Sequence, residues 1–264
     1  MCIRDRHGDK VLTNGFTFTA VPSAIVHAGC DPVYVETTPG YVVDVADLEK
    51  KMDANPDCKY FIVSHMRGKL ASMDKIKKLC DAKGVELLED CAHSLGVLWN
   101  GGHSGHHGTM AAFSSQSYKM LNSGEGGFFV TDDDYAAARC MAYAGAYEAL
   151  ADKHFCRPCD AALAKVMDGS IPNFSLRMHE GTAAMLRPQI KTIEARRATA
   201  SPTSVVDLTS SPSESPSSMV VTDLSSPSPR PGGRKSPGKR AASPGAGTLK
   251  DPGLREKMRA PRSA

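Results

Sequence analysis

The amino-acid sequence predicts an α/β domain with a mostly parallel sheet, followed by a disordered tail. Short β-like runs alternate with helical stretches between Lys10 and about Ala142, and two of the runs are apolar enough for buried strands. From about Ala198 onward Ser, Pro, Gly, Lys and Arg dominate, and such a segment cannot bury enough apolar surface to offset its ordering entropy. We therefore expect a folded domain over 8–197 and a Ser/Pro-rich basic tail over 198–264.

The expected strands are short runs bounded by polar or turn-forming residues. Two of them, which contain 61–63 and 85–88, are short and largely apolar, as expected of buried strands. The full set is 32–36, 59–64, 85–89, 109–113 and 127–131.

The expected helices follow residues that cap helix N-termini well. Asp44 and Ser72 precede two stretches with apolar residues at helical spacing. Pro188 should kink or divide the last helix, because proline removes a backbone donor and clashes with the preceding turn. The set is 45–52, 73–82, 134–143, one helix within 156–170, and 177–197.

Composition restricts the cellular setting. The stretch 11–30 has the length of a secretory signal, but polar residues such as Asn14 and His27 interrupt its apolar core, so export is not expected. No apolar run is long enough to span a membrane. The eight cysteines are scattered, which fits a reducing compartment, and we expect a cytoplasmic protein. The opening residues 1–7 resemble no helix or strand start, and we interpret them as foreign to the domain.

Two groups of potential metal ligands occur in the sequence, but neither predicts a metal site. Cys156 and Cys159 could form half of a zinc site, but no second pair at matching spacing follows, so we expect two free thiols. His103, His106 and His107 lie in a glycine-rich run, which favours a solvated loop. No metal site is expected.

An acid and a lysine occupy positions where a ligand would gather. Asp90 closes the strand 85–89, and in doubly wound sheets ligands collect beyond the C-terminal ends of the strands. Lys119 lies further on, in a polar connection that contains several glycines. Taken alone, Asp90 is an ordinary strand-end or capping acid and Lys119 a solvated charge.

Four motifs occur in order around these two residues: Glu89-Asp90-Cys91-Ala92-His93-Ser94, Phe113-Ser114, Lys119, and Gly124-Glu125-Gly126-Gly127. Together they resemble the sugar aminotransferases of the DegT/DnrJ/EryC1/StrS family, which belong to fold type I of the pyridoxal phosphate enzymes. The block 59–68, followed by Met73 and Asp74, is similar to that family's strand, His-x-x-Gly turn and helix start. The resemblance covers about 11–197 and implies the fold type I large domain with pyridoxal 5'-phosphate as cofactor.

The resemblance assigns a role to each matching residue. Lys119 would form the Schiff base with the cofactor, and Asp90 would hold the protonated pyridine nitrogen. Ser114 would bind the phosphate, and His93 would lie beside the ring. Pyridoxal phosphate needs an amine, a carboxylate, a flat group and anion donors, so these residue types suit the chemistry.

Two further positions match the family. Phe18 would stack on the cofactor ring, with Phe16 the weaker choice, although either could be a core aromatic. Arg177 lies in an element similar to the family's Asn-x-Arg-Met, which approaches the phosphate of the partner subunit, and could also be a plain surface residue. Ser175 stands where that element usually has Asn.

The resemblance implies an aminotransferase that acts, as a homodimer, on a nucleotide-linked keto-sugar, with glutamate or glutamine as amino donor. Family members carry a phosphate-binding turn ahead of the stacking aromatic and a C-terminal small domain, and this sequence has neither. A truncated non-catalytic relative serving in interactions therefore stays open as an alternative. A pyridoxal phosphate enzyme of different reaction type is another, although retention of Lys119 speaks against the dehydratases that lack it.

The tail carries ten Lys and Arg residues against five acids, and seven Ser-Pro pairs. A basic tail could touch nucleic acid, but without aromatics or a folded reader specific nucleic-acid binding is not expected. The Ser-Pro pairs could accept phosphate from proline-directed kinases, which would cancel the positive charge.

Overall fold

The computed structural model describes residues 8–145, 157–166 and 171–199. All of them belong to one compact unit of the chain. Residues 1–7, Cys156 and 200–264 lie outside the described residues, and with them the expectations for the opening segment, the cysteine pair and almost all of the tail. Among the described residues, no helix combines the length and the apolar character needed to cross a membrane.

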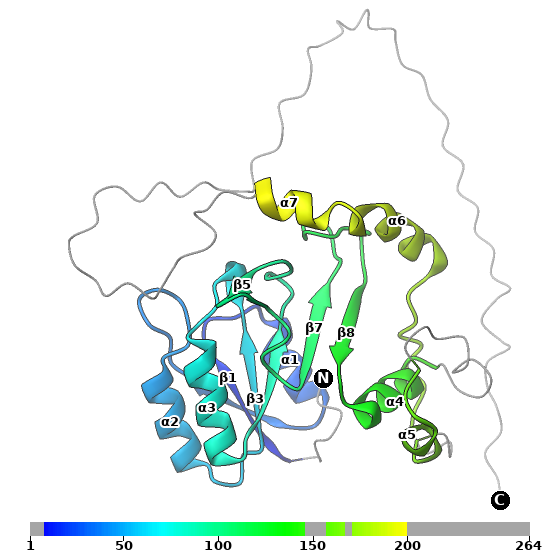
Figure 1. The fold of residues 1–264 in the computed structure, drawn as a ribbon. Helices are drawn as coiled ribbons and strands as arrows, with labels where there is room; N and C mark the ends of the chain where they lie inside the picture. Colours follow the sequence, from blue (N-terminus) through cyan, green and yellow to red (C-terminus); the bar gives the residue numbers. More distant parts are fainter. Residues whose placement is uncertain (1–7, 146–156, 167–170, 200–264) are drawn as a thin grey trace, which may run out of the picture. The chain divides into compact units, whose positions relative to one another are not determined.

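A six-stranded sheet forms the centre of the fold, with strand order β2-β1-β3-β4-β7-β8 (Figure 1). Neighbouring strands from β2 to β7 run parallel, and only β8 is antiparallel to its neighbour. The strands are β1 (Lys10–Asn14), β2 (Asp31–Val35), β3 (Tyr60–Ser64), β4 (Glu86–Asp90), β7 (Met110–Ser114) and β8 (Gly127–Thr131). The expected α/β class with a mostly parallel sheet is confirmed.

Both faces of the sheet are buried, because successive residues of each strand point to opposite sides. Phe61 and Leu87 pack on one face against α2 (Val45–Ala54) and α3 (Met73–Lys83). Their chain neighbours Ile62 and Leu88 pack on the other face with α1 (Ala20–His27) and α4 (Asp134–Tyr143). These two apolar layers make the short strands stable and fix their register.

The helix starts follow the capping chemistry of the sequence. Asp44 accepts hydrogen bonds from the backbone N–H groups of Ala46 and Asp47 and begins α2. Asp133 caps α4 in the same way through the backbone N–H of Ala136. Ser72 precedes α3 as expected, but its side chain makes no capping bond.

The strand β1 and the helix α1 are absent from the sequence-based expectation. They occupy most of the stretch 11–30, which the sequence analysis compared with a secretory signal and did not divide into a strand and a helix. Asn14, which interrupts the apolar run, is buried at the end of β1 and bonded there, so its polarity is satisfied inside the fold. A two-stranded hairpin of β5 (Leu98–Trp99) and β6 (Gly102–His103) was also missed.

Three helices follow α4 in the described residues: α5 (Asp160–Ala164), α6 (Glu180–Ile190) and α7 (Ile193–Thr199). Pro188 lies inside α6, and the division between the last two helices comes after Ile190. Gln189 holds the connection between β7 and β8, since its side chain accepts from the backbone N–H of Asn122 at 3.0 Å and donates to the Asn122 carbonyl at 2.6 Å. The helix α6 therefore packs against the segment that carries Lys119.

Candidate active site at the carboxyl edge of the sheet

Four parallel strands end in polar residues at the same edge of the sheet. The order β1-β3-β4-β7 brings these residues together from distant parts of the sequence, because parallel neighbours present their carboxyl ends on one side. They are Asn14, Ser64, Asp90 and Ser114.

Asp90 is fixed by a hydrogen bond to each carboxylate oxygen. The Ser64 hydroxyl donates to Oδ2 at 2.7 Å, and the backbone N–H of Ala92 donates to Oδ1 at 3.1 Å. Ser64 is in turn held by Asn14, whose side chain accepts from the Ser64 N–H at 2.8 Å and donates to its carbonyl at 3.2 Å. Each Asp90 oxygen keeps one lone pair for a further donor, so the carboxylate is oriented and still able to bind a cation.

Lys119 lies in the connection between β7 and β8, and its backbone N–H donates to the Gln116 carbonyl at 3.1 Å. Partial burial lowers the pKa of the Lys119 ammonium, and the charge of Asp90 opposes this shift. The two side chains therefore lie within electrostatic reach, although 28 residues separate them in the chain. A lysine with a lowered pKa is neutral for more of the time at neutral pH, as a nucleophilic amine must be.

His93 lies in the turn after β4, among the same charges. Partial burial lowers its pKa, Lys119 and Arg67 lower it further, and Asp90 acts in the opposite direction. The His93 Nδ1 accepts from the backbone N–H of Arg67 at 3.4 Å. One electrostatic group therefore contains His93, Asp90 and Lys119. Arg67 also acts on His93, although the sequence analysis had given Arg67 no role.

The two aromatic candidates differ in their surroundings. Phe16 packs on Tyr41 with ring centroids 5.0 Å apart, so its ring is engaged within the chain. Phe18 follows β1 and is 60% exposed. An exposed ring at this edge of the sheet is available for stacking, and it matches the residue preferred from the sequence.

The two residues expected to bind phosphate, Ser114 and Arg177, lie in different parts of the fold. Ser114 ends β7 at the carboxyl edge, where its hydroxyl accepts from the backbone N–H of Gln116 at 3.2 Å. Arg177 is exposed in the segment before α6, and no described contact joins it to Asp90 or Lys119. The structure thus brings Ser114 to the group at the sheet edge and leaves Arg177 outside it.

Glu89, next to Asp90, is a buried carboxylate to which the sequence analysis assigned no role. Its Oε2 accepts from the His65 ring and from the Gly105 N–H, each at 2.9 Å, and its Oε1 accepts from the N–H groups of His107 and Gly108, each at 2.7 Å. Burial alone would raise the Glu89 pKa, but these donors outweigh it and lower the pKa to about 2.

Glu89 thereby ties the glycine-rich run to β4. Ser104 and Gly105 are buried, so the loop expected to be solvated packs inward at its centre. Gly108 permits this approach, since a Cβ there would lie 2.5 Å from the Leu87 carbonyl oxygen. A single strand therefore presents Glu89 to one side, where it fixes the loop, and Asp90 to the carboxyl edge.

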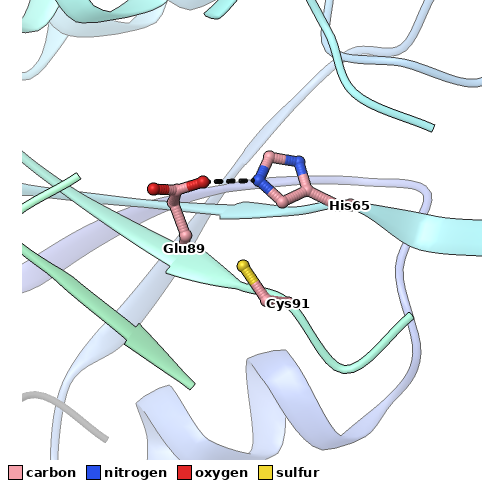
Figure 2. A group of neighbouring side chains, drawn as sticks. All are labelled: His65, Glu89 and Cys91. Atoms are coloured by element: carbon pink, nitrogen blue, oxygen red, sulfur yellow. Dashed lines mark hydrogen bonds and ion pairs between the residues drawn. The ribbon is translucent and has the colours of Figure 1, made fainter. Parts of the chain in front are cut away.

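His65, Glu89 and Cys91 are the one set of three potential metal ligands in the described part of the chain, with ligand atoms within 4.8 Å of one another (Figure 2). The four donors already saturate the Glu89 carboxylate, and burial raises the pKa of the Cys91 thiol well above its usual range. A metal would have to displace these donors and ionise a buried thiol. We therefore interpret the group as a hydrogen-bonded support of the β4 end.

The chain matches the DegT/DnrJ/EryC1/StrS aminotransferase family over residues 3–204. It is 35% identical over 133 residues to an L-glutamine:scyllo-inosose aminotransferase of Streptomyces griseus, a match that covers 50% of this chain and 31% of that protein. It is 33% identical over 135 residues to a GDP-perosamine synthase of Vibrio cholerae, covering 51% of this chain and 36% of that protein.

Solved structures agree with these matches. An aminotransferase from Psychrobacter cryohalolentis superposes with a TM-score of 0.57 and is 27% identical, and the match covers 71% of this chain and 47% of that one. The chain thus spans about half the length of the solved relatives and about a third of the curated ones. The fold is that of the fold type I pyridoxal phosphate enzymes. The chain belongs to the DegT/DnrJ/EryC1/StrS aminotransferase family, whose members depend on pyridoxal phosphate.

Proposed function

We propose that this chain carries the cofactor-binding part of a pyridoxal phosphate-dependent aminotransferase, with Lys119 as the residue that bonds the cofactor. The observation that carries the proposal is the electrostatic coupling of Lys119 with Asp90 at the carboxyl edge of the sheet. A lysine of lowered pKa beside an oriented carboxylate suits a cofactor that needs an amine at one end of a ring and an acid at the other.

The residues present fit this cofactor. Asp90 has a lone pair left on each oxygen after its bonds to Ser64 and Ala92, so it could accept a hydrogen bond from a protonated pyridine nitrogen. Phe18 offers an exposed ring for stacking, and Ser114 a hydroxyl for the phosphate. Arg177 is proposed for the phosphate bound by a partner subunit.

When bound, pyridoxal phosphate supplies an electron sink for the carbon that loses or gains an amino group. Lys119 would first hold the cofactor and then, once a donor amine replaces it, move a proton with its neutral amine. Asp90 would keep the ring nitrogen protonated, and the Ser64 hydroxyl would keep Asp90 aimed at it. His93 would lie beside the ring. Its lowered pKa favours the neutral imidazole, which can pack against the ring without repelling the protonated ring nitrogen.

The amino donor would be glutamate or glutamine and the acceptor the ketone of a nucleotide-linked sugar. The names of two relatives support these substrates. The L-glutamine:scyllo-inosose aminotransferase supports glutamine as the donor, and the GDP-perosamine synthase supports a nucleotide-linked sugar. We further propose that the protein acts in the cytoplasm as a homodimer, in which each subunit helps to complete the site of the other.

Reduction with borohydride tests the assignment of Lys119. Purified full-length protein is incubated with pyridoxal phosphate, reduced, and digested, and the labelled peptide is identified by mass spectrometry. We expect one label on Lys119, at a pH below the ordinary pKa of a lysine because burial lowers the Lys119 pKa. The variant Lys119→Arg should take up no specific label, and Lys165→Arg is the control that should label normally.

A protein that carries no label on Lys119 would contradict the catalytic assignment and favour the interaction role. If Lys119 is labelled, glutamate and glutamine are added to the unreduced protein, and absorbance is followed for conversion of the cofactor to its amine form. Failure with both donors would favour a pyridoxal phosphate enzyme of another reaction type.

A further inference from the structure

The short helical turn η1 (Met66–Gly68) joins β3 to the candidate site. The N–H of His65 donates to the Asp90 carbonyl at 3.1 Å, and the N–H of Arg67 donates to the His93 ring at 3.4 Å. Gly68 approaches so closely that a Cβ there would lie 3.0 Å from the His93 carbonyl oxygen. The turn is thus bound to both ends of the segment that follows β4.

Arg67 has an unfavourable backbone conformation within this turn. Its φ of +57° lies in the left-handed region, which a residue with a Cβ occupies only at an energetic expense. Glycine would adopt the same conformation without strain. Residues with a strained backbone conformation cluster at active sites and ligand-binding segments.

The Arg67 guanidinium is exposed and has no carboxylate partner within the described part of the chain. Its charge nevertheless acts on His93, as does the charge of Lys119. Two cations therefore lie around His93, and Asp90 is the acid that faces them. Once Asp90 pairs with a cationic ring nitrogen, as the proposed function requires, the Arg67 charge is left without compensation.

We propose that Arg67 binds the carboxylate of the amino donor, an inference that rests on the proposed function. A guanidinium presents parallel N–H donors that match the two oxygens of a carboxylate. The carboxylate of an amino acid is one bond away from the reacting carbon, so it must lie close to Lys119 and His93. A nucleotide phosphate is separated from the reacting carbon by several bonds and is the less suitable anion for a cation at this place.

Isothermal titration of the cofactor-loaded, full-length protein tests the proposal. Glutarate is the carboxylate probe, because it has no amine and cannot react, and inorganic phosphate is the competing probe. We expect Arg67→Gln to weaken glutarate binding at least tenfold and Arg67→Lys to restore part of it, with phosphate binding unchanged. The control Lys69→Gln removes a nearby, partly exposed cation, bonded to the Gly40 carbonyl, and should leave both affinities unchanged.

The strain at Arg67 supplies a second readout. Arg67→Gly should raise the melting temperature while weakening glutarate binding as strongly as Arg67→Gln, which separates a binding role from a folding role. Unchanged glutarate affinity in both variants would overturn the proposal, as would equal losses for glutarate and phosphate, or a loss for phosphate alone. If wild-type protein fails to load the cofactor on Lys119, the proposed function itself is wrong, and this outcome is seen before any titration begins.

Discussion

The buried Glu89 carboxylate should make a large, pH-dependent contribution to stability, and Glu89→Gln measures it. The folded-state pKa of about 2 compares with 4.5 for an unperturbed glutamate. A difference of this size corresponds to roughly 3 kcal/mol of folding free energy. The amide oxygen of glutamine could satisfy two of the four donors and its NH2 would face the other two, so the loss should be at least that large.

The sign of the pH dependence follows from the lowered pKa. The stabilisation is fully present above the unfolded pKa of about 4.5 and is lost as the pH falls toward about 2. Urea unfolding followed by circular dichroism should show wild type more stable than Glu89→Gln by roughly 3 kcal/mol at pH 7. The difference should shrink steadily between pH 4.5 and pH 2.

The exposed Glu49 on α2 provides the matched control, and Glu49→Gln should change the free energy of unfolding by less than about 0.5 kcal/mol. At neutral pH the buried substitution should lower the melting temperature by about 6–12 °C for a domain of this size. A loss under about 1 kcal/mol, or one that stays constant from pH 7 to pH 2, would refute the assignment of an ionised Glu89 with four donors.

Three further changes give separate tests. Ser64→Ala removes the donor to Asp90 and should raise the Kd for pyridoxal phosphate about tenfold. Ser64→Thr keeps the hydroxyl and should leave this Kd unchanged. Equal affinities of the two variants in a fluorescence titration would show that Ser64 does not position Asp90. Ser175 has a φ of +53°, so Ser175→Asn should stabilise the fold by about 0.5 kcal/mol in thermal unfolding, and a loss would count against strain there. Asp44→Ala should cost about 1 kcal/mol in urea unfolding through the lost N-cap of α2, and Asp44→Ser should recover most of it.

Local patterns were enough to predict most of the elements near the sheet. Strand β8 and helix α4 have the expected bounds, and the other expected strands of the sheet differ by one residue at either end. The strand β1 was missed because its buried polar residues, Thr13 and Asn14, break the apolar pattern. The buried Asn14 side chain is bonded to Ser64 of the neighbouring strand β3, and a single sequence does not reveal that neighbour.

The departure at Ser175 also has a structural interpretation. The position adopts a left-handed conformation, where asparagine is more favourable than serine, and Asn173 accepts from the Ser175 N–H at 2.7 Å. The resemblance identified the unusual residue, and only the backbone angle explains why asparagine suits the position.

The sequence by itself determined the alternation of strands and helices, the family, and the lysine and acid proposed to act on the cofactor. Each of these depends on residue types at short spacing, which a linear pattern contains. Only the tertiary structure decided that Ser64 orients Asp90, that Glu89 anchors the glycine-rich loop, and that Arg67 lies against His93. These contacts join residues 19 to 26 positions apart, and the register of the parallel strands, set by burial of both sheet faces, is what brings them together.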